Sequence, residues 1–585
     1  MINAIFYIAS FFFAVIMIAL LPKKEQKINA VTDVMFAYVT ILCVTSLLAF
    51  LINLLGVPIN LLSMGGIYLS LGIFALIFIA GKKNIQHHII RKIDVISVAL
   101  LVSTVGIMML FIFTPYIHFN YYNQVDPCNH FLYASDIVHS EKLGGMFFNS
   151  LYNAMFMELL TWAVPPSWLY KAFILSDIYH LILELIFFYA CIVASKEKMK
   201  KYTPLAWSMF YWWSFLLFSF LWGFIYWSMA VMLVQYVILL IKFQEEHKER
   251  KKMLWALMGV GVFAITMCYI EFTPGIVLTL LAIIIYNNYI DGKIKWNIAN
   301  AKYLVMIAIL FVIVMIVGYH YVFQDRGITF LDALKMGKQQ NIGLELVLML
   351  PLVLIIILRS VREKRKLTVL QLAYLANVSV QILYTILAIC HVISTYYLQK
   401  TFFILFFLSI VVILEGCTAW SRKMYQYIGI AALSVLCFFV LSYDGDDSKT
   451  FSLQQSTLIQ NLSILSEHNF SEGTLSDNGK IYLMQYAMEE MGEENESIPL
   501  IISTPINRGI GSWLEATYRD SSFIWLEDIV CTEEQMTSML QSKNATHFII
   551  FFDDLLYIYD LHDYFDSFER VYRNDAGFIG EISWE

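Results

Sequence analysis

The chain has 585 residues, of which 59% are hydrophobic and 15% are charged, and its mean hydropathy is +0.66. Soluble domains carry roughly 25% charged residues, so this composition excludes a water-soluble globular protein. The net charge is −7, but it is unevenly distributed. Residues 1–443 contain 20 acidic and 32 basic residues, whereas residues 444–585 contain 26 acidic and 7 basic residues. An acidic exposed part would repel phosphates, which argues against nucleic acid as a partner.

Apolar runs of about 18 to 25 residues recur from Met1 to about Ser442, and each is long enough to cross a bilayer as a helix. Basic residues in short loops stay on the cytoplasmic side, and here they follow every second run, from Lys23 to Arg422. This alternation predicts a polytopic α-helical protein of the cell membrane with about fourteen transmembrane helices. The N-terminus and everything after Tyr443 are then extracytoplasmic.

The connections that alternate with these basic loops along the chain are predicted to lie together on the outer side. They are the turn near Gly56 and the segments 116–171, 222–225, 271–274, 323–342 and 393–400. The stretch 204–243 is expected to form two helices joined by a tight turn. Side chains that are distant in sequence but lie in these connections are therefore expected at the same end of a helix bundle.

The outer loop 116–171 is too long and too patterned for a simple connector. Asp126 precedes Pro127, a pair typical of a helix start, so one interpretation of Asp126 is a helix cap. His130 follows one turn later, which places an imidazole beside a carboxylate on the same helix face. In the other interpretation, Asp126 accepts a proton from an attacking hydroxyl, and His130 orients it or assists the transfer. Asp126 and His130 are thus the candidate catalytic residues.

Ionisable residues also occur inside the fifth apolar run, where Asp177, His180 and Glu184 are spaced three and four apart and share one face. Such groups are costly in a membrane and normally face a cavity or a partner. A substrate-binding cavity and an internal packing network both explain them. Glu271, in a short outer turn, and His320, at the outer end of the tenth run, are candidates for the same cavity.

The outer turn before the thirteenth run ends at Lys400, on the side where short loops usually avoid lysine. Two interpretations are open. Lys400 snorkels to the membrane surface between aromatic residues, or Lys400, Tyr396 and Tyr397 hold an anionic head group such as a phosphate.

The acidic part, 444–585, alternates strand-like and helix-like segments. Short apolar segments at 498–503, 523–526 and 546–552 predict strands, and 480–491 and 533–542 predict amphipathic helices. We therefore expect an extracytoplasmic α/β domain of roughly 130 residues, large enough for its own core. It contains no phosphate-binding glycine motif, so nothing in it indicates nucleotide binding.

Together these features resemble the GT-C superfamily of membrane glycosyltransferases, whose donors are sugars on polyprenyl phosphates. The resemblance covers the many helices, the long first outer loop with its acidic residue, the late Tyr-Tyr-x-x-Lys segment and the outer C-terminal domain. The closest local match is the run Asp126, His130, Ala134 and Ile137, similar to a pattern in uncharacterised bacterial members. Two features depart from the family: four helices precede the loop where many members have one, and no acidic pair such as Asp-x-Asp is present.

The resemblance implies an inverting transferase that moves a sugar from a polyprenyl-phosphate donor to an extracytoplasmic glycan, lipid or protein. The loop acid is the base in such proteins, and this role falls on Asp126. The donor leaves as polyprenyl phosphate, for which Lys400, Tyr396 and Tyr397 are the expected ligands. No cofactor is expected, and the sequence does not indicate a divalent metal. A transporter or flippase of a lipid-linked glycan and an O-antigen-type polymerase or ligase are the alternatives.

Overall fold

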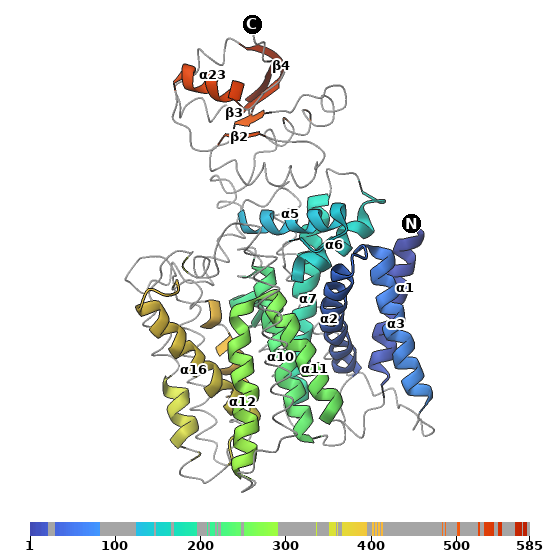
Figure 1. Cartoon of the computed structure of the whole chain (residues 1–585), viewed down its shortest axis with the longest axis vertical. Coiled ribbons are helices and arrows are strands. Elements are labelled where there is room, and N and C mark those ends of the chain that lie inside the picture. The colour runs from blue at the N-terminus through green and yellow to red at the C-terminus, as the bar shows by residue number, and fades with distance from the viewer. Residues whose placement is uncertain are drawn as a thin grey trace.

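The computed structural model describes about half of the residues of the chain. The described residues are 1–21, 30–81, 125–144, 148–164, 169–195, 211–216, 224–246, 251–290, 350–358, 366–394, 400–402, 404–405, 407–409, 411–412, 500–502, 524–526, 532–542, 548–552, 568–575 and 577–581, with isolated positions at 208, 219, 335, 360, 483 and 486. Most of these residues are helical, and a small sheet lies near the C-terminus (Figure 1).

Six of the described helices are long and apolar enough to cross a membrane. They are α1 (Ile2–Ala19), α2 (Ala30–Leu54), α3 (Leu61–Ala80), α7 (Leu169–Ser195), α10 (Ile225–Glu246) and α16 (Val369–Ile389). Two further apolar helices, α11 (Lys251–Cys268) and α12 (Thr273–Ile290), run beside them (Figure 1). A polytopic helical membrane protein fits this arrangement. The predicted runs that end near 115, 322 and 443 lie outside the described residues.

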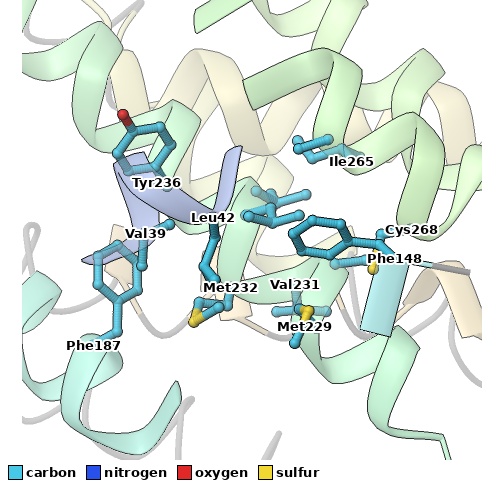
Figure 2. Close-up of a cluster of buried hydrophobic side chains, with 14 of the residues drawn as sticks. Val39, Leu42, Phe148, Phe187, Met229, Val231, Met232, Tyr236, Ile265 and Cys268 are labelled. Atoms are coloured by element: carbon cyan, nitrogen blue, oxygen red, sulfur yellow. The ribbon is translucent and has the colours of Figure 1, made fainter. Parts of the chain in front are cut away.

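Helix α10 is the centre of the bundle. Its apolar residues cover all faces, as expected for a helix enclosed by others, and 94% of its spanning window is buried. Figure 2 shows Met229, Met232 and Tyr236 of α10 among side chains of α2, α7 and α11. The outer helices α1 and α3 are each only 28% buried over the same window, so their remaining apolar surface suits lipid.

Helices α1 and α3 pack closely because glycines line their contact. Gly65 and Gly72 of α3 lie two turns apart and leave space for the rings of Phe6 and Phe13. Small residues allow such close approach of membrane helices. Tyr68, between the two glycines, is fully buried and lies 3.5 Å, oxygen to oxygen, from the hydroxyl of Tyr7.

Two helices of the predicted outer loop cap one end of the bundle. Helix α5 (Val125–Ser140) lies across that end, and α6 (Phe148–Leu160) runs beneath it (Figure 1). The residues after α5 are hydrogen-bonded to the turn between α2 and α3. The Ile59 amide donates to the Glu141 carbonyl at 2.7 Å, and the Asn60 side chain donates to the Glu141 carboxylate at 3.0 Å. The N-terminus and the C-terminal sheet lie at this same end (Figure 1).

The C-terminal sheet is mixed. It contains β1 (Leu500–Ile502), β2 (Ile524–Leu526), β3 (Phe548–Phe552), β4 (Glu569–Asn574) and β5 (Gly577–Glu581) in the order β2-β1-β3-β5-β4. Strand β1 is parallel to both its neighbours, whereas β5 is antiparallel to β3 and β4. Helix α23 (Glu533–Ser542) lies between β2 and β3 along the chain.

The structure confirms the three predicted strands and the predicted helix at 533–542. Strands β4 and β5 were not predicted, because β4 is mostly charged or polar and β5 contains two glycines, both unfavourable signals for a strand. The predicted helix at 480–491 lies outside the described residues, apart from two helical positions, Leu483 and Tyr486.

Replacing Gly65 with Ala should lower the free energy of unfolding by about 1–3 kcal/mol, the usual cost of overpacking. The added Cβ would lie 2.7 Å from the Phe6 ring and 3.3 Å from the Tyr7 Cα atom. Gly66 is the matched control, since a Cβ there meets no atom within 4 Å and Ala favours a helix. In detergent, the midpoint of thermal unfolding should be lower for Gly65→Ala than for the wild type, and for Gly66→Ala it should equal or exceed the wild-type value. Equal midpoints for the two variants would contradict the packing described.

Candidate functional site

Helix α5 presents a mostly buried face to the bundle. Phe131, Ala134 and Ile137 are fully buried and His130 is 6% exposed, a spacing that matches one helix face. The helix begins at Val125, so Asp126 lies within its first turn and not at the position before it. Pro127 is tolerated there because first-turn amides have no partner within the helix. The side chain of Asp126 lies outside what the structure describes.

Lys400 does not snorkel to a surface. Its side chain is 5% exposed, and its Nζ donates a hydrogen bond to the Tyr226 hydroxyl at 2.9 Å. The same Nζ lies 3.8 Å from the centroid of the Phe224 ring, 5.3 Å from that of Tyr226 and 5.9 Å from that of Tyr269. Aromatic faces attract cations, most strongly away from water, so these rings stabilise the buried ammonium.

His130 of α5 joins this group. Its ring centroid lies 4.6 Å from that of Tyr226. Burial, and secondly the nearby Lys400 ammonium, lower the pKa of His130 to about 3. The imidazole is therefore neutral at physiological pH. We call His130, Phe224, Tyr226, Tyr269 and Lys400 the Lys400 cluster.

Glu271 lies beside the Lys400 cluster, in the turn η4 (Ile270–Phe272) between α11 and α12. Its backbone carbonyl accepts a hydrogen bond from the Tyr384 hydroxyl at 2.9 Å. Burial raises the pKa of its carboxyl to about 7, and the Lys400 ammonium opposes this rise. A carboxyl with that pKa can carry or release a proton near neutral pH.

Four connections that the sequence placed on the outer side meet here. They are the α5 loop, the turn before α10, the η4 turn and the segment that begins at Lys400. The turn before α10, expected within 204–243, is closed by a hydrogen bond from the Phe224 amide to the Ser219 carbonyl at 2.6 Å. The contacts between these segments support the predicted grouping of the outer connections.

The main chain at Lys400 is held separately from its ammonium. The indole Nε1 of Trp227 donates to the Lys400 carbonyl at 3.1 Å. Trp227 packs on Phe215, which belongs to a π-helical turn (Trp212–Leu216) and in turn contacts Tyr211. Such turns are rare and frequently occur at functional sites.

The structure places Glu184 and Asp177 of α7 in two separate networks. Glu184 accepts a hydrogen bond from the Tyr211 hydroxyl at 2.9 Å, and Gln235 donates to that hydroxyl at 3.2 Å. Asp177 instead accepts from Asn153 of α6 at 2.9 Å. No contact between described residues joins Glu271 to Asp177 or His180, so the prediction of a shared cavity gains no support.

The structure does not describe three of the predicted site residues. Tyr396, Tyr397 and His320 lie outside the described residues. Phe224, Tyr226 and Tyr269 were not predicted as site residues. The sequence could have indicated them, because each lies in or next to a connection that is predicted on the outer side, as is the turn that ends at Lys400.

The part of the chain that the structure describes contains no group of three or more His, Cys, Asp or Glu side chains placed to hold a metal ion. No model of a known protein family matches the sequence, and no curated protein matches it significantly. Function therefore has to be inferred from the residues themselves.

The low pKa of His130 predicts a loss of stability in acid. As the pH falls from 6.5 towards 3, the unfolded chain binds a proton at His130 that the folded protein does not, so the free energy of unfolding decreases. The loss from this residue amounts to about 2 kcal/mol at pH 5 relative to pH 8.

Thermal unfolding of the wild type and of His130→Phe, each referred to its own value at pH 8, measures this difference. The variant lacks the ionisable ring and should lose less stability than the wild type at pH 5. Curves that run parallel from pH 8 to pH 5 would contradict a buried, neutral His130.

Proposed function

We propose that this protein is a membrane glycosyltransferase that moves a sugar from a polyprenyl-phosphate donor to a glycan, lipid or protein on the extracytoplasmic side. The observation that carries the proposal is the contact between the Lys400 cluster and α5. A buried cation from a late connection lies beside His130, one helical turn from Asp126. This contact supports the assignment of a phosphate ligand and a carboxylate base to neighbouring segments.

The location favours a donor anchored in lipid. Nucleotide sugars are not available outside the cytoplasmic membrane, whereas a polyprenyl carrier stays in the bilayer beside apolar helices such as α1 and α16. The Lys400 ammonium, supplemented by Tyr396 and Tyr397, would bind the phosphate. Its burial strengthens this attraction, because a site that excludes water screens charge poorly.

The reaction is a single displacement at the anomeric carbon. The acceptor oxygen forms a bond to that carbon while the bond from the carbon to the phosphate oxygen breaks, and polyprenyl phosphate leaves with the electron pair. Asp126 takes the proton of the acceptor hydroxyl. Lys400 stabilises the negative charge that develops on the leaving oxygen. The neutral His130 orients Asp126, and the configuration at carbon inverts.

Replacing Asp126 with Asn should reduce release of polyprenyl phosphate by about 10²- to 10⁴-fold, the usual contribution of a general base. The assay incubates purified protein with radiolabelled polyprenyl-phosphate hexoses and pentoses and an extract of cell-envelope acceptors. Asp136→Asn, the same change ten residues later in α5, is the matched control and should keep wild-type activity. Release that survives in Asp126→Asn removes the assigned base, and no release by the wild type favours transport.

Replacing Lys400 with Met keeps most of the side-chain volume and removes the charge. We expect kcat/KM for the donor to fall by about 10- to 100-fold, as for the loss of a charged hydrogen bond. Lys142→Met is the matched control, because Lys142 is an exposed lysine in the segment after α5, at the same end of the bundle. Steady-state kinetics with varied donor measure both variants; equal kinetics would show that Lys400 serves packing alone.

A further inference from the structure

A second set of polar side chains is buried between α6 and α7. Asn149, Ser150 and Asn153 come from α6, and Asp177 and His180 come from α7; we call these five the Asn149 cluster. None of them is more than 6% exposed. Asn153 connects the two helices, because its amide nitrogen donates to Asp177 and its amide oxygen accepts from Ser176.

Several atoms of the Asn149 cluster have no hydrogen-bond partner within the described part of the chain. They are both amide atoms of Asn149, the Ser150 hydroxyl and Nδ1 of His180. Buried polar atoms in folded proteins are almost always hydrogen-bonded, since an unpaired one costs roughly 1–3 kcal/mol. The unpaired donors and acceptors on these two neighbouring helices lack partners that a bound polar group would supply.

The chemistry of the cluster selects a neutral ligand rich in hydroxyls. Amide, carboxyl, imidazole and hydroxyl groups both donate to and accept from alcohols. No salt bridge reaches Asp177 or His180 among the described residues, and no Lys or Arg contact to them is seen there, so an anion is not favoured. The aromatic ring of Tyr152 lies 6.1 Å, centroid to centroid, from that of His180.

The Asn149 cluster lies close beneath α5. Phe131, which follows His130 in α5, packs on Phe173 of α7 with ring centroids 5.3 Å apart. Asp177 is one helical turn further along α7, about 6 Å away along the axis. Asp177 and His180 are each 6% exposed.

We propose that the Asn149 cluster binds the hydroxyl groups of a neutral sugar, which is the acceptor if the transferase function proposed above holds. In that case the acceptor sugar lies on the α7 side of α5 and the donor phosphate lies on the side of Lys400. Asn149 forms two hydrogen bonds to neighbouring hydroxyls, and Ser150 and His180 form one each.

Binding of neutral methyl glycosides to the full-length protein in nanodiscs tests this site. The probes are the methyl glycosides of glucose, mannose, galactose and arabinofuranose, followed by saturation-transfer NMR. Asn149→Leu should weaken binding by at least about tenfold, because two hydrogen bonds are lost. It should not lower the thermal midpoint, since an apolar side chain of similar size replaces an unpaired amide. Ser150→Ala should weaken binding less, and Ser379→Ala, an exposed serine of α16, should leave it unchanged.

The outcomes separate this proposal from the transferase. No binding of any probe, or equal binding to wild type and Asn149→Leu, overturns the sugar site even if polyprenyl phosphate is released. Binding that is lost in Asn149→Leu but retained in Asp126→Asn supports the sugar site, whether or not any donor is used. A lower thermal midpoint for Asn149→Leu together with unchanged binding would show that Asn149 serves packing only.

Discussion

The arrangement at the outer end of the bundle depends on the burial of one positive charge. An ammonium group removed from water is costly unless hydrogen bonds and polarisable groups replace its hydration. Lys400 obtains these from the Tyr226 hydroxyl and from three aromatic rings. Each of these rings is more than 100 residues from Lys400 in the sequence, so the charge is accommodated only when these connections have assembled. This requirement couples the packing of the helices to the formation of the site.

Helix α5 connects the two polar regions through adjacent residues. His130 contacts Tyr226 in the Lys400 cluster, whereas Phe131 contacts Phe173 above the Asn149 cluster. The segment that follows α5 is fastened to the turn between α2 and α3, which fixes the far end of the helix. A displacement of α5 would therefore change the distance between the two regions, and its anchoring keeps their geometry constant.

The sequence predicted what depends on local pattern. Three strands and the helix at 533–542 follow from short apolar runs and amphipathic spacing, and the grouping of the outer connections follows from the lysines and arginines. The sequence could not decide whether Lys400 snorkels or is buried. That outcome depends on Phe224, Tyr226 and Tyr269, whose rings contact Lys400 only in the folded bundle. The separation of Glu184 from Asp177 depends likewise on partners, Tyr211 and Asn153, supplied by other helices. Strands β4 and β5 form through pairing, which outweighs their weak local preference.

The hydrogen bond from Trp227 ends on the main chain of residue 400, and not on its side chain. A bond to a carbonyl oxygen forms with any amino acid at that position. The indole therefore fixes where the chain passes, while the residue type decides which chemical group is presented to the ring-lined interior. In the transferase proposed above, this division allows a single substitution at position 400 to change the head-group preference without a rearrangement of the surrounding helices.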